Sequence, residues 1–415
     1  MVQNNFVETA QKGIKLSGYV DAGYSYNFTG SGNQSNVQGR FGSDTAQRGD
    51  FNLYAVKLAL EKAMTSENKA QAGFRTDVMI GEDANYFINR SAGQNSNTNQ
   101  NSNSLFLEQA YVSIRAPVGN GWDFKAGKFV SILGYEVMER PANMNTTYGL
   151  LFNVMPLYYT GLLSSYRFDD YLDGKLGVVN GSNSDNNTTT DPNVGDGVAV
   201  LAALNVTAPG GNANWSNNFQ YSTGSDNDTR QGEYLISVSP EAAAKYVHTG
   251  SAYYYFYNSW GSWAPHFADE KLLLGFNALL ANANGSLSYL SGQPYSGPSN
   301  LNTCWYGVGA YAKYRWNDWF SLAGRGEYLG SNNSWIFGNQ GTGATTKGIG
   351  NHVTGDNLWE YTLTAEFHVV EDLVIRTEYR MDWGSNIYVT STGGPQGLQS
   401  GGPAYYAGAE MVYGF

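Results

Sequence analysis

The sequence alternates apolar and polar residues with a period of two over stretches longer than most soluble strands. In residues 14–28 the even positions are mostly apolar and the odd positions mostly polar. The alternation recurs in 320–328, 359–369, 373–382 and 405–415. Such alternation places successive side chains on opposite faces of a strand. Strands of roughly 10 residues or more, apolar outward and polar inward, are typical of transmembrane β-barrels.

Composition excludes several other classes of protein. Only 14% of the 415 residues are charged, against about 25% in an average soluble domain. The 51 glycines argue against long helices, and 41% hydrophobic residues are too many for a disordered chain. A net charge of −11 disfavours a nucleic-acid partner.

The connections between strands alternate in length, as they do in bacterial outer-membrane barrels. Short turns are expected at 117–120, 169–170, 317–318 and 371–372, and long polar loops at 29–49, 81–104, 182–195, 283–303, 330–357 and 385–402. We therefore predict an all-β fold, a transmembrane antiparallel up-and-down barrel with short periplasmic turns and long external loops. Sixteen strands are predicted, at 14–28, 50–61, 69–80, 105–116, 121–130, 157–168, 171–181, 196–206, 214–223, 250–260, 271–282, 304–316, 319–330, 358–370, 373–384 and 403–415.

The interval 224–260 leaves the strand count open. Residues 234–239 could form a strand, while Pro240 and the alanines after it are typical of a helix start. We place 224–249 in one long external loop, and 18 strands remain the alternative. Residues 1–13 are expected to be a periplasmic segment ahead of a single barrel over 14–415.

The sequence favours an outer-membrane location. The best uncharged stretch, 141–166, contains Asn143, Asn145 and Pro156, so it is a poor transmembrane helix. No basic region followed by an apolar run opens the sequence, so we expect no secretory signal within this numbering. Outer-membrane lipid is the expected surrounding of the barrel.

One external loop, 131–156, is much less polar than its neighbours. An apolar loop exposed to water would be unfavourable, so we expect it to fold into the barrel, although packing on other loops or on a neighbouring subunit is the alternative. Folded inward, it would place Glu136, Glu139 and Arg140 in the pore as a constriction.

The positions of the strands that alternate with the apolar ones face inward, and they predict a charged pore wall. Its expected members near mid-strand are Arg75, Lys125, Arg325, Arg376, Arg380 and Glu378. Acidic residues on the loop opposite basic residues on the wall would create a transverse field that filters ions by charge. The alternative for each wall charge is a pair with a neighbour, such as Arg376 with Glu378 or Asp382.

Glu108 conflicts with the alternation, because it shares the parity of outward-facing Ala110, Val112 and Ile114. A carboxylate facing lipid is unfavourable. The residue is expected above the hydrocarbon, at a bulge, or in a subunit interface.

Two stretches resemble a known family. Residues 116–129 read APVGNGWDFKAGKF, and residues 134–143 read GYEVMERPAN, followed by LFN at 151–153 and TG at 160–161. These stretches are similar to the β-barrel porins of the OmpL-like type from Gram-negative bacteria. The resemblance implies an outer-membrane channel for small solutes, and 224–249 is long for that family.

The leading hypothesis is a porin for passive diffusion of ions and small hydrophilic solutes through a water-filled, charge-lined pore. One alternative is a solute-selective channel, for example for sugars, with a stacking track of Tyr19, Tyr111, Trp305 and Tyr311. Another is a structural barrel that houses a partner protein. Many 16-strand porins are trimers, so a homotrimer is a further possibility.

No catalytic residue, cofactor or metal site is predicted. The sequence contains neither a GxSxG nor an HExxH motif, so we expect no enzyme. Its one cysteine, Cys304, cannot form an internal disulfide.

Overall fold

The computed structural model describes residues 7–8, 13–28, 33–34, 49–91, 105–180, 198–223, 246–248, 253–289, 300–331, 356–384, 389–390, 399–400 and 403–415.

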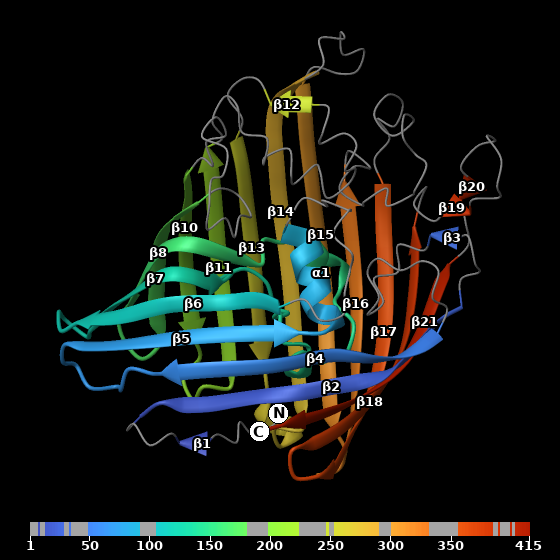
Figure 1. The fold of residues 1–415 in the computed structure, drawn as a ribbon, viewed down its shortest axis with the longest axis horizontal. Coiled ribbons are helices and arrows are strands. Elements are labelled where there is room, and N and C mark those ends of the chain that lie inside the picture. Colours follow the sequence, from blue (N-terminus) through green and yellow to red (C-terminus); the bar gives the residue numbers. More distant parts are fainter. Residues whose placement is uncertain are drawn as a thin grey trace.

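Sixteen long antiparallel strands form a closed barrel, which confirms the predicted fold class. Strand β2 pairs with both β4 and β21, so the first and last long strands close the sheet (Figure 1). The long strands are β2 (Lys15–Asn27), β4 (Gly49–Lys62), β5 (Gln71–Ile80), β6 (Leu105–Ala116), β7 (Trp122–Val130), β8 (Tyr158–Arg167), β9 (Leu172–Asn180), β10 (Val198–Thr207), β11 (Ala213–Thr223), β13 (Tyr253–Trp263), β14 (Leu272–Tyr289), β15 (Asn300–Arg315), β16 (Phe320–Ser331), β17 (Asp356–Val370), β18 (Leu373–Gly384) and β21 (Ala404–Gly414).

Two of the expected boundaries are wrong by several residues. Strands β14 and β15 run through most of the predicted loop 283–303 and pair as far as Gly285 with Leu301 and Ser286 with Asn300. Asn, Gly and Ser are frequent in these extensions, a composition that is typical of loops and that hid the strands in the sequence. A short strand, β12 (Tyr246–His248), pairs with β14 inside the predicted loop 224–249. Residues 234–239 and Pro240 lie outside the described residues.

Small elements complete the described structure. They are β1 (Val7–Glu8), which pairs with β2, the 3-10 turn η2 (His266–Ala268), and a three-stranded sheet of β3 (Asn33–Gln34), β19 (Val389–Thr390) and β20 (Gln399–Ser400).

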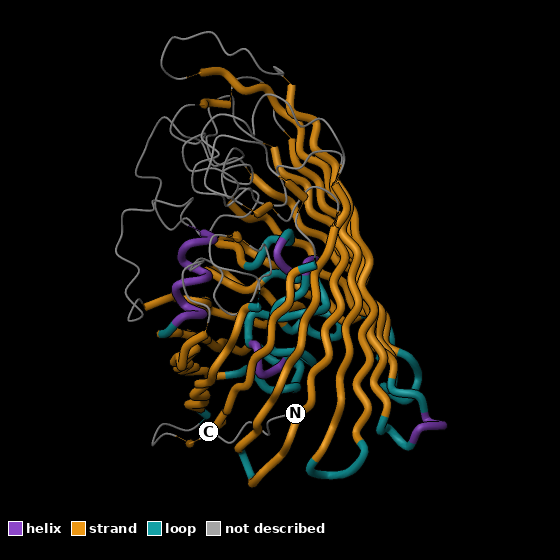
Figure 2. The backbone as a smooth tube through the Cα atoms, turned by 90° about the vertical axis from the view of Figure 1, so that its right-hand side faces the viewer, coloured by secondary structure: helices purple, strands orange, loops and turns teal. Residues whose placement is uncertain are grey.

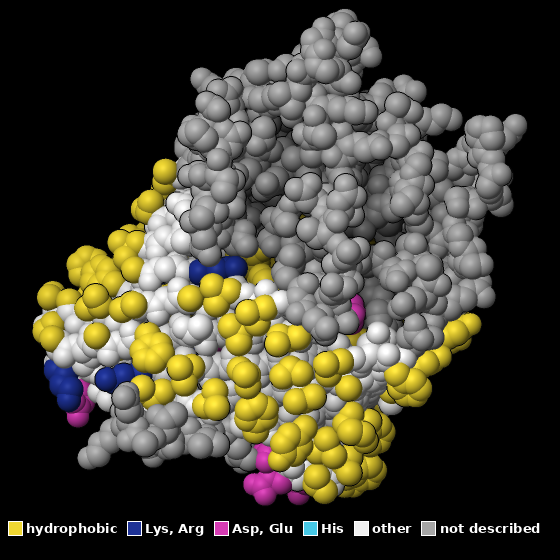
Figure 3. Space-filling model, viewed as in Figure 1, with side chains coloured by type: hydrophobic (Ala, Val, Ile, Leu, Met, Phe, Trp, Pro, Cys, Tyr) yellow, Lys and Arg dark blue, Asp and Glu magenta, His cyan; other side chains and the backbone are white. Residues whose placement is uncertain are grey.

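The outer face of the barrel is apolar, as the alternation predicts. Hydrophobic side chains cover the described strands in Figure 3, and charges gather near the end that carries the short turns. Trp122, Phe168, Trp316 and Trp319 are exposed at those turns. Phe51 and Tyr405 are exposed near the far ends of their strands. Two zones of exposed aromatics are what a barrel needs at two membrane interfaces.

Chain segments also lie inside the barrel (Figure 2). One is α1 (Glu82–Ser91), which lies within an interval expected to be a loop. The negative charges of Glu82 and Asp83 in its first turn stabilise the N-terminus of the helix, and Ala84 and Phe87 are buried. The other is the connection between β7 and β8, residues 131–157, called the third loop below. It contains a 3-10 turn, η1 (Arg140–Ala142), and a short helix, α2 (Leu150–Asn153). Among the described residues, no helix is long and apolar enough to cross a membrane.

Two β-bulges turn extra side chains inward. The pairing of β5 with β6 passes from Asp77–Gln109 to Val78–Leu107, so Glu108 has no partner residue across the strand. A bulge shifts the parity of the strand, and Glu108 is fully buried inside the barrel. The second bulge, between β2 and β4, turns Tyr54 inward in the same way. The bulge resolves the conflict that Glu108 posed in the sequence.

Candidate functional site

The third loop packs an apolar face against the inner wall of the barrel. Leu150, Leu151 and Phe152 of α2, with Leu133, Met138 and Met155, are buried in one cluster. The same cluster contains wall residues from opposite parts of the sheet, namely Phe106, Phe256, Leu279, Ala281, Trp305, Leu329, Leu358, Tyr406 and Val412. Burial of this surface explains why such an apolar segment folds inward.

Two wall glycines make room for the loop. A Cβ atom on Gly307 of β15 would lie 2.3 Å from a methyl carbon of Leu151. A Cβ atom on Gly275 of β14 would lie 2.4 Å from the ring of Tyr135. No side chain fits at either distance, so the loop rests directly on the wall backbone.

Arg325 of β16 joins the loop to the wall by charge. Its Nη1 atom donates to Glu136 Oε1 at 2.5 Å and to the Thr147 carbonyl at 2.6 Å. Its Nε atom donates to Glu360 Oε2 of β17 at 2.9 Å. All three charged side chains are almost fully buried. A buried guanidinium shared between two carboxylates is a strong link only while every partner is present.

Strand β18 binds the loop backbone. The carboxylate of Glu378 accepts hydrogen bonds from the backbone N–H groups of Thr146 and Thr147, at 2.6 and 3.1 Å. Arg380 donates to the Tyr148 carbonyl at 2.5 Å and to Asp382. These contacts satisfy backbone groups that would otherwise be buried without partners.

Arg376 binds the loop from the same strand. It donates to the carbonyls of Asn143 and Arg140 at 2.9 and 3.1 Å, and its ion-pair partner is Glu410 of β21. The pairs suggested from the sequence, Arg376 with Glu378 or Asp382, are therefore not the ones formed.

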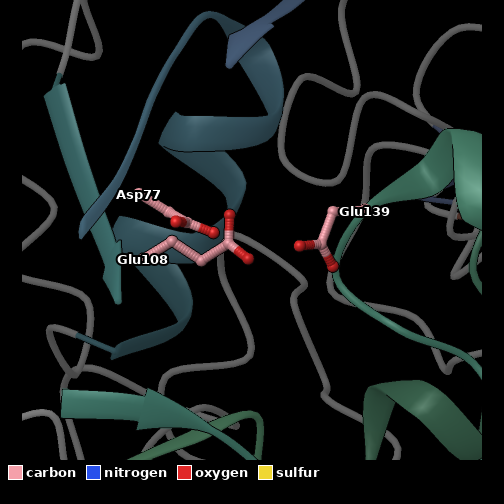
Figure 4. Close-up of side chains that lie close together, drawn as sticks. All are labelled: Asp77, Glu108 and Glu139. Carbon is pink, nitrogen blue, oxygen red and sulfur yellow. The ribbon is translucent and has the colours of Figure 1, made fainter. Parts of the chain in front are cut away.

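A second charged cluster holds the other side of the loop. Lys57 of β4 donates from Nζ to Glu108 Oε1 at 3.0 Å, lies 3.2 Å from Asp77 Oδ2, and also pairs with Glu139 of the loop. Figure 4 shows the three carboxylates converging, two from the wall and one from the loop. Their oxygens lie within 4.8 Å of one another, which is suitable for a cation. We assign the Lys57 ammonium as that cation, because it contacts all three carboxylates.

Burial alone would raise the pKa of the Glu139 carboxyl, but the adjacent Lys57 ammonium outweighs burial and the pKa is lowered. Glu139 therefore stays ionised and paired at neutral pH.

Arg140 ties the loop to α1. Its Nε atom donates to Asp83 Oδ1 at 2.8 Å, both side chains being buried. Its guanidinium lies 3.8 Å from the centre of the Tyr148 ring, a favourable cation–π distance. The helix that the sequence missed thus supplies a partner for a residue that the sequence singled out.

A cavity of about 290 Å³ remains between the start of the loop and strands β6 to β9. Lys125 of β7 and Lys175 of β9 line it, with Gln109, Ser165, Tyr135 and Trp260. Lys125 lies over the Tyr111 ring at 4.6 Å. Neither lysine forms an ion pair with a described residue. Arg75, in contrast, pairs with Asp77 at 2.8 Å.

The structure places every predicted site residue inside the barrel, and most of them form ion pairs rather than opposed open charges. Glu378 instead binds backbone N–H groups of the loop, and Lys125 forms no ion pair with a described residue. The sequence interpretation missed several partners, namely Lys57, Asp77, Asp83, Glu327, Glu360 and Glu410. It also missed Lys175, which lines the cavity. Lys57 could have been found, because Val56, Leu58 and Leu60 alternate with it and face outward. Asp83 could not, since the helix around it was unexpected.

A family model matches residues 13–415, almost the whole chain, and its description is "Putative beta-barrel porin-2, OmpL-like". The chain belongs to this porin family. The resemblance seen in the two sequence stretches is thereby confirmed. No curated protein sequence matches this porin.

Solved outer-membrane barrels share the fold of this porin. The outer membrane channel DcaP of Acinetobacter baumannii aligns with a TM-score of 0.59 and 13% identity, covering 98% of this chain and 99% of that chain. Salmonella typhi OmpF, in complex with daunomycin, aligns with a TM-score of 0.54 and 13% identity, covering 99% and 100%. The trimer form of Vibrio cholerae OmpT aligns with a TM-score of 0.54 and 10% identity, covering 97% and 99%. At these identities the likeness establishes the fold.

Proposed function

We propose that this porin is a passive channel in the outer membrane of a Gram-negative bacterium, through which ions and small hydrophilic solutes diffuse without catalysis or cofactor. The observation that carries the proposal is a closed 16-strand barrel whose interior is lined by polar and charged side chains. Barrels of this size are too wide for wall side chains to fill, and they enclose an aqueous channel.

The third loop is the proposed constriction. Glu136, Glu139 and Arg140 each bind a buried partner of opposite charge, on the wall or on α1. In this proposal these charges fix the position of the loop and hence the width of the passage. Arg325, Arg376, Arg380 and Glu378 serve the same purpose from the wall. Selectivity among ions then depends on the charges left without partners.

The sugar-channel alternative has less support. Tyr19, Trp305 and Tyr311 are buried, and Tyr311 packs against Tyr135 of the loop with ring centres 4.4 Å apart. Side chains covered in this way cannot stack with a passing sugar ring. A barrel that houses a partner protein also has less support, because the chain's own loop and α1 occupy the interior.

We further propose that the porin assembles as a homotrimer. The fold is shared with an outer-membrane protein whose structure was determined in a trimer form. The outward strands expose apolar side chains that can face either lipid or a neighbouring subunit.

Planar-bilayer recording of the purified, folded protein tests both proposals. Stepwise openings with a linear current–voltage relation are expected, and a trimer should close in groups of three equal steps. A barrel that inserts but stays electrically silent contradicts the channel, and single independent steps contradict the trimer.

A further inference from the structure

The two lysines of the cavity differ from the basic side chains that hold the third loop. Arg325, Arg376, Arg380, Arg140 and Lys57 all bind carboxylates. Lys125 and Lys175 bind none among the described residues, although both are half-buried. Glu61 and Asp123 act on Lys125 only electrostatically, without an ion pair. A half-buried ammonium group without a paired counter-charge is costly, and an anionic ligand would relieve that cost.

The strand register brings the lysines to one place. Lys125 of β7 lies opposite Leu163 of β8, and Lys175 of β9 lies opposite Ser165. Leu163 and Ser165 point to the same inner face, because they are two residues apart. The two lysines therefore flank one strand and are offset by two residues along it, at a backbone separation of about 12 Å. Their long side chains can converge on a small ligand.

The remaining lining supplies both polar and apolar contacts. Ser165 lies between the lysines, and Gln109 lies at the cavity wall. Trp260 and Tyr135 form an aromatic pair with ring centres 6.2 Å apart. Small-molecule sites commonly combine an apolar lining with a few polar groups that fix orientation.

Two carboxylates also line the cavity, but neither is available to the lysines. Glu136 binds Arg325 through Oε1 and accepts a hydrogen bond from the Gly149 N–H through Oε2. Glu139 binds Lys57. The charge left without a partner in the cavity is thus positive.

We propose that this cavity is a binding site for small organic anions, such as aromatic carboxylates, with Lys125 and Lys175 holding the carboxylate and Trp260 and Tyr135 contacting the apolar part. The proposal rests on the channel function and gives that channel a substrate class. A solute that binds here would pass the loop on the side of β7 to β9, where no ion pair joins the loop to the wall among the described residues.

The test compares benzoate, benzamide and benzylammonium as probes of the same shape and different charge. Each is added during single-channel recording in KCl, and each is also titrated calorimetrically into the folded protein in detergent. The variant is Lys125→Gln with Lys175→Gln. The matched control is Lys62→Gln with Lys69→Gln. It removes two exposed lysines near the turn between β4 and β5, outside the cavity. Unchanged heat-modifiable mobility verifies that the variants fold.

Benzoate is expected to bind and to block the current of the wild type and of the control, whereas benzamide and benzylammonium are not. In the cavity variant, benzoate affinity should fall about tenfold for each lysine removed. The proposed site would be overturned if the cavity variant bound benzoate as tightly as the wild type, or if the wild type bound benzylammonium as tightly as benzoate. Continued conductance in KCl would then show that the channel function itself still stands. A silent wild-type barrel would instead remove the channel function, and calorimetry would still decide the binding site.

Discussion

Arg325 is the wall residue whose replacement should release the third loop most strongly. It is fully buried and contacts two carboxylates, Glu136 on the loop and Glu360 on the wall. Changing Arg325→Gln keeps a polar side chain of moderate size but removes the positive charge. The two carboxylates then face each other without compensation, and undocking moves Glu136 into water.

The size of the effect follows from this geometry. Removing one partner of a buried ion pair costs about 3–5 kcal/mol. If undocking relieves that cost, the undocked fraction of the loop rises by about two to three and a half orders of magnitude. The barrel itself should stay folded, because the backbone pairing of β16 with β15 and β17 does not involve the side chain.

A thiol on the loop can report the undocked fraction. The chain has one cysteine, Cys304, so a Cys304→Ala background with Val154→Cys carries a single thiol on the loop. Val154 is 7% exposed, and Cys is close to it in volume. The rate at which a charged methanethiosulfonate modifies this thiol is then proportional to the undocked fraction of the loop. Hydrogen-exchange rates report local opening in the same way.

Two comparisons make the result decisive. Adding Glu136→Gln to Arg325→Gln should restore part of the protection, because one uncompensated carboxylate is removed. Arg115→Gln is the matched control, since Arg115 pairs with Asp123 near a short turn and donates to the carbonyls of Thr65 and Glu67, which lie outside the third loop. A modification rate unchanged by Arg325→Gln, or raised equally by Arg115→Gln, would refute the reasoning.

Three further predictions concern the same loop. Lys57→Met should lower the free energy of unfolding by about 3–5 kcal/mol, because buried Asp77 and Glu108 lose their cation, and added Ca²⁺ should restore part of the loss. The unfolding midpoint is measured by heat-modifiable mobility, with Lys69→Met as the control. Equal midpoints for Lys57→Met and the control would contradict the prediction. Gly307→Ala should displace Leu151 and raise the conductance. Gly324→Ala should not, because the nearest atom to a Cβ at that position is 3.9 Å away. Identical currents in both variants would show that the loop does not rest on β15. The lowered pKa of Glu139 means that its pairing stabilises the docked loop above the ordinary carboxyl pKa of about 4.3 and is lost as the pH falls through the lowered value. The contribution of Glu139 to conductance should therefore be constant from about pH 8 to 5 and be lost only in stronger acid. A change between pH 7 and 5 that Glu139→Gln abolishes would oppose this.

The barrel could be predicted from the sequence because its determinants are local. Alternation in each strand sets the inward and outward faces, and turn length sets the order of the strands. The prediction was wrong in the extensions of β14 and β15, because their Asn, Gly and Ser residues are typical of loops. Glu108 shows the same limit, because a bulge reverses parity without changing composition.

The interior was only partly predictable. The apolar character of 131–156 indicated that it packs against something, and the charges Glu136, Glu139 and Arg140 stood out within it. Their partners could not be assigned, because Lys57, Asp83 and Arg325 come from distant parts of the chain. Which charges end without a partner depends on the whole arrangement, and Lys125 and Lys175 became distinct only after the other pairs were known.

The most direct test of the account is the conductance of a porin that lacks the third loop. Val130 and Tyr158 are paired residues at the ends of β7 and β8, so a short glycine-containing turn can join these strands. Single-channel conductance and the size of the largest polymer that enters the channel should both increase relative to the wild type. A folded, inserted barrel with unchanged conductance and polymer cutoff would contradict the assignment of the third loop as the constriction.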